Sequence, residues 1–300
     1  MSKTAKWLIG IFGFLAVFAF IVIAGIVSLL ADGSETQDLE QGTGGTIAVV
    51  ELNEAITSSQ SIVRQFKRYR ENVGVRAIVF RIESPGGGVS ASQEIYEEVK
   101  KTRKYGKPVV VSMGSVAASG GYYVALGADR IVANPGSITG SIGVISQFMH
   151  VNGLLDKIGV SSTTIKSGAL KDAGSPFRPM TAEDRKYFQE MIDDVHDQFI
   201  TAVADERKMP KERVKRIADG RVFTGRKALA LGLVDTLGTY QDAVRIAADL
   251  AGLGTAPRII TERKKERLSD MIFGELRGDM TALRDRLLDQ PIVQYRYVQP

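Results

Sequence analysis

PVVVSMGSVAASGGYY, residues 108–123, joins an apolar run to a serine that has only small neighbours. Residues 108–112 are typical of a buried strand, and a helix-like run begins after Ser119. The first backbone N–H groups of a helix have no partner within the helix, so the N–H of Gly120 is a candidate for stabilising an oxyanion. Ser119 is therefore a candidate nucleophile, although capping of the helix is an alternative role for the same side chain.

Strand-like and helix-like segments alternate along the rest of the chain. Apolar, β-branched runs predict strands at residues 46–51, 76–82, 108–112, 130–133, 141–146 and 163–166. Helical patterns are found at residues 59–71, 90–105 and 181–208. The alternation predicts an α/β fold built from parallel β-α units.

The amino-terminal residues predict a membrane anchor. Lys3 and Lys6 precede residues 7–31, which carry no charge and reach roughly 37 Å as a helix, enough to span a bilayer core. A cleavable signal peptide usually has a shorter apolar stretch and an A-x-A-like site, so we expect an uncleaved anchor. Basic residues before the span and acidic ones after it predict a cytoplasmic amino terminus, with the rest of the chain outside.

Composition limits the chemistry further. The absence of cysteine excludes disulfides, thiolate catalysis and cysteine-based metal sites. The net charge of +5 is modest, and the basic residues are interspersed with acidic ones, which indicates an ordinary solvated surface and no nucleic-acid partner.

A serine nucleophile needs a base, and the residues alone offer few candidates. The only histidines are His150, beside a turn, and His196, which lies among aspartates and indicates a solvated helix face. Lysine can serve instead if burial lowers its pKa toward neutrality. Lys171 lies in a turn-rich loop of small residues, yet a lysine is ordinarily a solvated surface charge.

Four segments make the chain resemble a known family. SPGGGV at 84–89, GSVAASGGYY at 114–123 and SGALKDAGSPFR at 167–178 are similar to signal peptide peptidase A, the serine-lysine membrane proteases of family S49. GRVFTGRKALALGLVDTLG at 220–238 is similar to that family's closing signature. The match covers about residues 46–250 and resembles the short, single-domain form.

The resemblance implies a fold and a set of site residues. The expected fold is a repeated β-β-α superhelix like that of the Clp protease and crotonase superfamily, preceded by one transmembrane helix. By position, Ser119 would be the nucleophile and Lys171 the general base. Gly120, together with Gly86 or Gly87, would supply the oxyanion hole; an ordinary type II turn after Pro85 is the alternative for those two glycines. No cofactor and no metal are implied.

The expected function is that of a membrane-anchored serine endopeptidase, which would degrade remnant signal peptides and other membrane-associated or unfolded polypeptides. Short members of the family assemble into rings and can share dyads between protomers, so we expect a homo-oligomeric ring. The alternatives are a non-catalytic membrane scaffold and a crotonase-like acyl-thioester enzyme.

The same reading divides the chain into four parts. Residues 1–31 would be a cytoplasmic stub and transmembrane anchor, 32–45 a flexible linker and 46–255 the protease domain. Residues 256–300 would form a helical extension, because Leu268, Met271, Leu276 and Leu283 recur at helical spacing.

Overall fold

The computed structural model describes residues 45–263 and 294–297, the strand at 35–40 and a few residues between 7 and 20. Asp38–Thr261 and Pro291–Pro300 form a compact unit that contains every motif described above. Within the described residues no helix is long and apolar enough to cross a membrane. The expected anchor at residues 7–31 falls mostly outside them.

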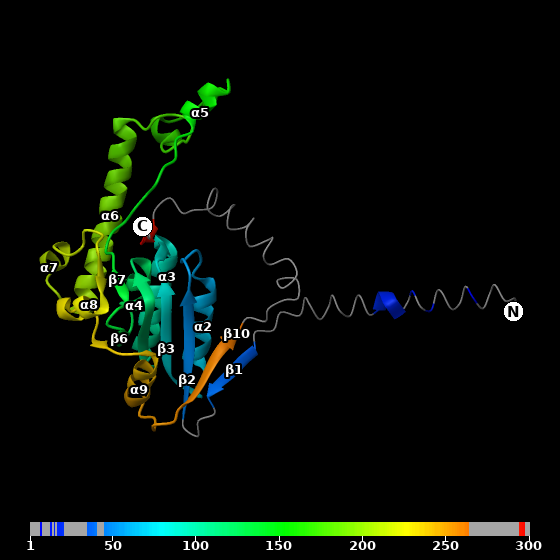
Figure 1. Cartoon of the computed structure of the whole chain (residues 1–300), viewed down its shortest axis with the longest axis vertical. Helices are drawn as coiled ribbons and strands as arrows, with labels where there is room; N and C mark the ends of the chain where they lie inside the picture. Colours follow the sequence, from blue (N-terminus) through cyan, green and yellow to red (C-terminus); the bar gives the residue numbers. More distant parts are fainter. Residues whose placement is uncertain are drawn as a thin grey trace. The chain divides into compact units, whose positions relative to one another are not determined.

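A predominantly parallel sheet forms the centre of this unit (Figure 1). Among the described residues it has nine strands, whose main path runs β1-β10-β2-β3-β5-β6-β9. The bounds on this path are β1 Glu35–Glu40, β10 Arg258–Arg263, β2 Thr46–Asn53, β3 Val75–Ser84, β5 Val109–Ala118, β6 Arg130–Ala133 and β9 Thr236–Leu237. β7 (Ile138–Gly140) pairs parallel with the end of β5 and antiparallel with β8 (Val222–Thr224).

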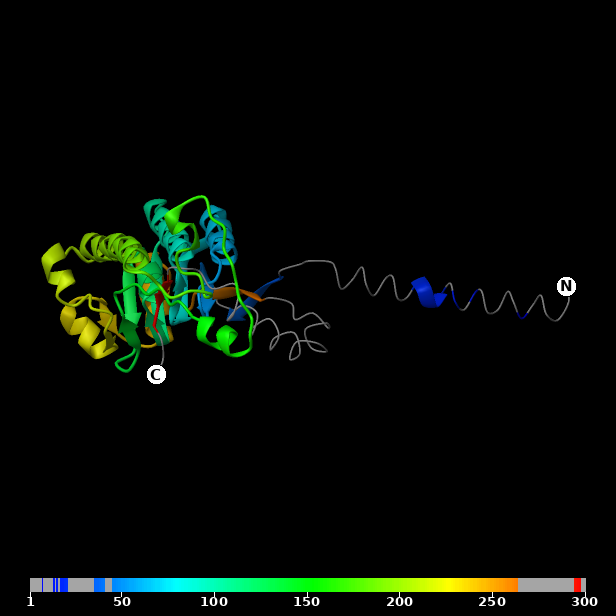
Figure 2. The ribbon, with the colours of Figure 1, turned by 90° about the horizontal axis from the view of Figure 1, so that it is seen from above.

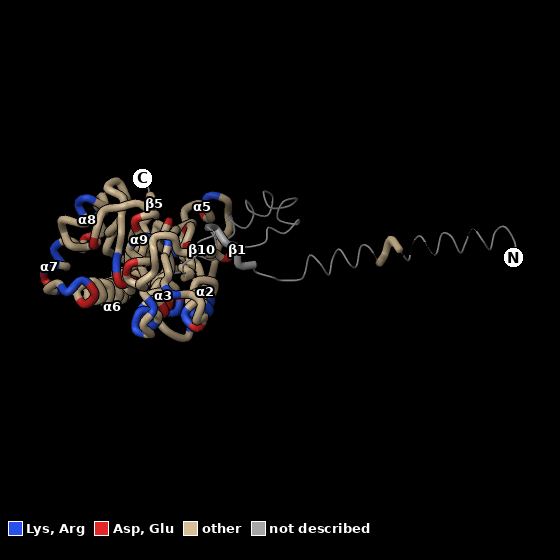
Figure 3. The backbone as a smooth tube through the Cα atoms, turned by 90° about the horizontal axis from the view of Figure 1, so that it is seen from below, with Lys and Arg blue, Asp and Glu red and all other residues tan. Residues whose placement is uncertain are grey.

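Helices cover both faces of the sheet because its buried strands carry apolar residues on both sides. On β2, Ile47 and Val49 pack in a cluster with α9 (Tyr240–Leu250), whereas Ala48 and Val50 belong to a larger cluster on the other face. The helices that contribute to the larger cluster are α2 (Gln60–Glu71), α3 (Val89–Lys104), α4 (Gly120–Ala125), α6 (Ala182–Arg207), α7 (Lys211–Lys215) and α8 (Gly225–Leu231). Figure 3 shows Lys and Arg lying among Asp and Glu on the outer helices, as the composition indicates.

Two predicted strands are wrong. Instead of residues 141–146, the strand in this region is β7, because the chain turns at Gly140 (φ +77°) and Ser141 (φ +50°). Residues 163–166 form no strand: Ile165 is 97% exposed, and none of the described strands pairs with this segment.

Residues 146–181, which we call the arm, leave the sheet before the chain returns through α6. The arm contains the short helix α5 (Asn152–Lys157) and a 3₁₀ turn, Ala169–Asp172. Figure 1 shows α5 beyond one end of α6, well apart from the sheet. Large apolar side chains on the arm are exposed, namely those of Met149, Leu154, Ile158, Val160, Ile165 and Phe177.

The described ends of the carboxyl-terminal extension are strands, not helices. β10 extends the sheet because Ile259 and Ile260 are β-branched and buried, one in each apolar cluster. β11 (Gln294–Arg296) pairs antiparallel with β4 (Gly86–Gly88), and both views show it within the folded unit (Figures 1 and 2). The residues of the predicted apolar stripe lie outside the described residues. β1 lies in the segment expected to be a linker.

Candidate active site

Ser119 stands at the junction of β5 and α4 in an unusual backbone conformation. Its φ is +53° and its ψ is −115°, a region that residues with a side chain rarely adopt. Two backbone hydrogen bonds hold it there: the Ser119 N–H donates to the Gly140 carbonyl at 2.8 Å, and the Tyr123 N–H donates to the Ser119 carbonyl at 2.8 Å. A sharp strand-to-helix turn of this kind presents a nucleophile at the edge of a sheet.

The Ser119 hydroxyl is not used by the chain's own structure. It makes no capping hydrogen bond to α4, which removes the alternative role suggested by the sequence. The side chain is buried, yet its Oγ has no hydrogen-bond partner among the described residues. Because a buried polar atom is normally paired, the free hydroxyl indicates a function outside folding.

Ser119 is followed by a glycine that lies against the glycines of β4. A Cβ on Gly120 would stand 3.1 Å from the Gly87 nitrogen and 2.7 Å from Ser92 Oγ, so no side chain fits there. Gly86 has a φ of +98°, and a Cβ on it would lie 2.6 Å from the Gly120 nitrogen. The structure therefore brings together the three glycines predicted for the oxyanion hole.

Gly86 to Gly88 form a strand, not an isolated turn. Ile56 flanks them on one side: its N–H donates to Gly86 O at 2.8 Å, and its carbonyl accepts from Gly88 N at 2.8 Å. A Cβ on Gly87 would lie 2.2 Å from Ile56 O, which explains why the strand is built from glycine.

Glu83 is a supporting residue that the sequence reasoning missed. Its carboxylate accepts hydrogen bonds from the backbone N–H groups of Ser115 (2.8 Å) and Val116 (3.0 Å). These bonds give partners to backbone N–H groups of β5 at the point where the pairing of β5 with β3 shifts in register, between Ile82 and Ser84 on β3. Glu83 thus fixes the bend in β5 that leads to Ser119; its position just before the Ser84-Pro85 turn is the only local signal for it.

Lys171 is not brought to Ser119 within the described chain. It lies on the 3₁₀ turn of the arm with its side chain exposed. Its neighbour Asp172 is held by Arg178 at 2.9 Å and by Lys166 at 2.6 Å, and these hydrogen bonds lower the pKa of the Asp172 carboxyl. Arg178 also binds Asp184 in the first turn of α6. The turn carrying Lys171 is thereby fastened to the start of a long helix.

Neither histidine replaces the lysine. His150 is exposed on the arm, and neither ring is hydrogen-bonded to Ser119 Oγ. His196 does not lie on a solvated face as expected: it is half-buried on α6, and its Nε2 is buried without a partner among the described residues.

Comparison with known proteins decides the family. The model of peptidase family S49 matches residues 101–254, about half of the chain. The chain belongs to peptidase family S49. A Clp protease model matches residues 46–137, in agreement with the expected Clp protease-like α/β fold.

Relatives in family S49 extend over most of the chain. It is 47% identical over 209 residues to "Putative protease slr0021" of Synechocystis sp., covering 69% of this chain and 75% of that protein. It is 35% identical to "Putative signal peptide peptidase SppA" of Enterococcus faecium, and the match covers 79% of this chain and 64% of that protein. "Serine protease SPPA, chloroplastic" of Arabidopsis thaliana is 33% identical, with 91% of this chain covering 38% of that one. This S49 chain is a serine protease.

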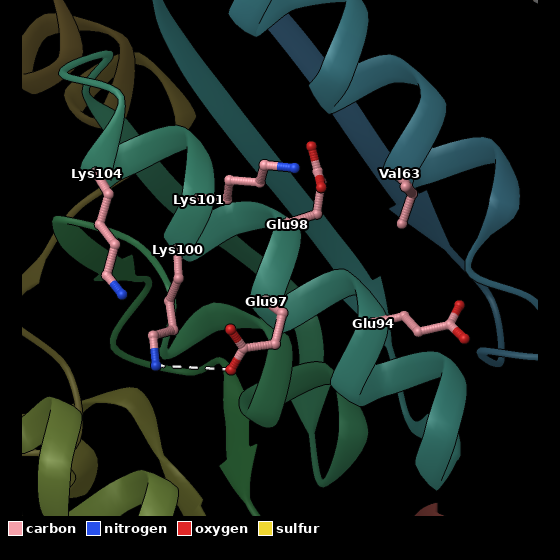
Figure 4. A pocket seen from close by; sticks show the side chains of 7 residues that line it. All are labelled: Val63, Glu94, Glu97, Glu98, Lys100, Lys101 and Lys104. Carbon is pink, nitrogen blue, oxygen red and sulfur yellow. Dashed lines mark ion pairs between the residues drawn. The ribbon is translucent and has the colours of Figure 1, made fainter.

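Figure 4 shows a cavity of this S49 chain whose lining does not include Ser119. It has a volume of about 570 Å³ and is lined mainly by Glu and Lys side chains of α3, with Val63 from α2. Lys100 and Glu97, three positions apart on α3, form an ion pair at 3.7 Å. None of its lining residues belongs to the segments around Ser119 or Lys171. The described residues contain no cluster of three or more His, Asp or Glu that could hold a metal ion.

Proposed function

We propose that Ser119 and Lys171 form a serine–lysine dyad assembled from two copies of this chain. The observation that carries the proposal is the buried Ser119 Oγ, which has no partner within the described residues of its own chain. The lysine expected to serve it is exposed on the arm, where another copy can reach it. A second copy would therefore complete a site that one chain leaves open.

The arm itself favours a second copy as its partner. On this one segment, Met149, Leu154, Ile158 and Ile165 are each more than half exposed. Exposed apolar side chains gathered on one segment mark a contact surface more often than a free one. A ring of such contacts would bring each Lys171 to the Ser119 of a neighbour.

The proposed reaction follows from the groups at the site. Lys171 accepts the Ser119 proton as Oγ attacks the peptide carbonyl carbon, and the N–H of Gly120, with that of Gly86 or Gly87, stabilises the oxyanion. The amine leaves with the proton from Lys171, and a water molecule then hydrolyses the acyl-enzyme, restoring Ser119. The substrate is a peptide in extended form.

We further propose that the protease is anchored in the membrane by residues 7–31, with the catalytic unit outside the cytoplasm. The uncharged length of that segment supports the anchor, and the basic residues before it support the orientation. A site held near the bilayer favours remnant signal peptides and other membrane-associated or unfolded polypeptides as substrates. The Enterococcus faecium relative is named a putative signal peptide peptidase, which supports this substrate class.

Mixing inactive variants tests the shared dyad. Ser119→Ala and Lys171→Ala should each lower kcat for an unstructured apolar peptide by about 1,000-fold or more, because the dyad acts as a unit. Co-expressed in one cell, the two variants should regain part of the activity, since some interfaces combine an intact serine with an intact lysine. Lys157→Ala, on the same arm, is the control and should remain active.

Two results would contradict the proposal in different ways. If either single variant hydrolyses the peptide as fast as the unaltered protein does, the residue substituted in that variant is not part of the dyad. Two inactive variants that never complement each other place both groups in one chain instead of two.

A further inference from the structure

β5 contains a bulge a few residues before the nucleophile. It pairs with β3 up to Met113 and again from Ala117, so that only Glu83 of β3 faces the residues between them. Along the other edge of β5, the pairing passes from β6 to β7 across the same stretch. Gly114 and Ser115 consequently have no partner residue on any of the described strands. A bulge of this kind bends a strand, and bulges are frequent beside active sites.

The Glu83 carboxylate fills the bulge from the β3 side. Its Oε2 accepts from the N–H of Ser115 at 2.8 Å, and its Oε1 accepts from the N–H of Val116 at 3.0 Å. A Cβ on Gly114 would lie 1.8 Å from Oε2, so glycine is needed there to leave room for the carboxylate. An ionised carboxylate offers only acceptors and binds such donors more strongly than a neutral group does. Glu83 thus replaces the hydrogen bonds that a paired strand would supply.

Side chains from both neighbouring strands bind the carbonyl groups of the bulge. Ser137, in the turn between β6 and β7, donates from Oγ to the Gly114 carbonyl at 2.5 Å. This hydroxyl is buried and accepts in turn from the N–H of Asn134 at 3.1 Å. The Met113 carbonyl accepts from the Arg81 guanidinium at 3.3 Å and from the Asn134 amide at 3.4 Å. Backbone groups that lack a ladder partner are therefore paired with side chains.

Glu83 links the two strands that carry the proposed oxyanion hole. Along the chain it stands three residues before Gly86, where β3 leads into β4. Through its carboxylate it holds the part of β5 that leads to Ser119 and Gly120. A change in this contact would shift the N–H of Gly120 relative to the glycines of β4.

From this geometry, and resting on the proposed role of Ser119 as the nucleophile, we infer that Glu83 is a positioning residue for catalysis, with Ser137 as its counterpart on the other edge of β5. The two side chains set the position of β5 against β4 and thereby place Ser119 Oγ and the Gly120 N–H. Their effect passes through the backbone of β5, so it belongs to the rate of the chemical step and not to peptide binding.

Replacing the carboxylate with an amide tests this role in the full-length protein in detergent. Glu83→Gln keeps the shape of the side chain but turns an NH2 group toward one of the two backbone N–H donors. We expect kcat for an unstructured apolar peptide to fall about 10- to 100-fold, with KM unchanged within about twofold, because a misplacement of about 1 Å can cost that much in rate. Glu51→Gln, which alters an exposed carboxylate on β2, is the matched control and should change neither constant.

Labelling by a serine-directed phosphonate gives a readout that does not depend on turnover of a peptide. Glu83→Gln should slow the labelling of Ser119 by about the same factor as kcat. A purely structural role would lower the thermal midpoint without slowing the folded enzyme. An unchanged kcat in folded Glu83→Gln protein, or a loss confined to KM, would therefore overturn the inference. If this variant does not fold, Ser137→Ala is measured in its place, with the same expectation for kcat and KM.

Gly114→Ala tests the same contact from its other side. The added Cβ should displace the Glu83 carboxylate, so a double variant with Glu83→Gln and Gly114→Ala should be about as slow as the slower single variant. Gly136→Ala is the control, because nothing lies within 4 Å of its Cβ position. Losses that multiply in the double variant would show that the two residues do not act through one contact, contrary to the inference.

The catalytic proposal and this inference can fail separately. Full activity of Ser119→Ala would remove the proposed nucleophile, whatever the effect of Glu83→Gln. An inactive Ser119→Ala together with a fully active Glu83→Gln would remove only the positioning role.

Discussion

At the scale of single residues, Ser119 combines a strained backbone with an unpaired hydroxyl. A φ of +53° and a ψ of −115° suit glycine, and the β-carbon of serine opposes them. Non-glycine residues in such regions cost on the order of 1–3 kcal/mol, and they persist where the surrounding structure holds them. Here the hydrogen bonds to Gly140 and from Tyr123 do so.

Removing the β-carbon should therefore stabilise the protein while inactivating it. Ser119→Gly is expected to raise the free energy of unfolding by about 1 kcal/mol, whereas Ser119→Ala retains the β-carbon and gains little. Both variants should lose activity. Urea denaturation of the two proteins beside the unaltered chain measures the difference, and equal stability of the two would show that the backbone at residue 119 is not strained.

Gly120 offers a second residue-scale prediction. Gly120→Ala should lower kcat by about 100-fold or more, since its Cβ would stand 2.7 Å from Ser92 Oγ and displace the N–H beside the nucleophile. Adding Ser92→Ala relieves that contact and should restore part of the kcat. Gly153→Ala is the control, because nothing lies within 4 Å of its Cβ position. If Ser92→Ala restores no activity, the contact of the added Cβ with the β4 backbone, and not its contact with Ser92, causes the loss of kcat.

At the scale of elements, the structure of the arm depends on the ion pairs of Arg178 with Asp172 and Asp184. Arg178 lowers the pKa of both Asp172 and Asp184, so these carboxylates contribute stability above their ordinary pKa of about 4. That contribution is lost as the pH falls below this value and through the lowered pKa values of the folded state. Arg178→Ala removes the arginine's part of this contribution at every pH and leaves the Lys166–Asp172 ion pair.

The turn that carries Lys171 should consequently loosen in acid. Hydrogen exchange, expressed as protection relative to an unfolded peptide, is expected to be constant for residues 166–181 above about pH 4 and to fall progressively below it. Arg178→Ala should show low protection already at neutral pH and a reduced kcat. Protection that is independent of both pH and Arg178 would contradict this account.

Lys107 provides an element-scale prediction on the opposite side of the fold. Its buried ammonium donates to the carbonyls of Tyr69 (2.6 Å) and Asn72 (2.7 Å) at the end of α2. Lys107→Met leaves both without this donor and should cost roughly 1–3 kcal/mol of stability. Lys104→Met, an exposed lysine at the end of α3, should cost far less; similar thermal midpoints for the two variants would refute the capping role.

At the scale of the whole molecule, the arm's apolar surface should control assembly. Ile165→Asp is expected to reduce self-association and activity together, since a charge in an apolar contact opposes burial. Val73→Asp is the matched control: this valine is 94% exposed in the turn before β3, outside the arm. Sedimentation in detergent measures the assembly, and an unchanged oligomer with Ile165→Asp would remove the arm from the interface.

The sequence predicted features that are local and periodic. Runs of apolar, β-branched residues placed β2, β3 and β6, and small residues around Ser119 indicated the turn. Contacts between distant segments left no such signal: Gly87 pairs with Tyr295 across two hundred residues, and Glu83 acts on a bend in another strand. In the proposed shared dyad, the position of Lys171 relative to Ser119 would depend on how copies meet, which no pattern along one chain encodes.

The composition of β4 has a consequence for which cellular proteins could serve as substrates. A strand made of three glycines presents only main-chain atoms to a chain that pairs with it, so β4 cannot distinguish one sequence from another by side-chain contacts. In the proposed protease, a substrate that pairs with β4 would have to be extended already, with its own backbone amides unpaired over several residues. Folded proteins, whose amides are already hydrogen-bonded, would not be bound, so substrate selection would depend on the residues that face β4 and on prior unfolding of the substrate.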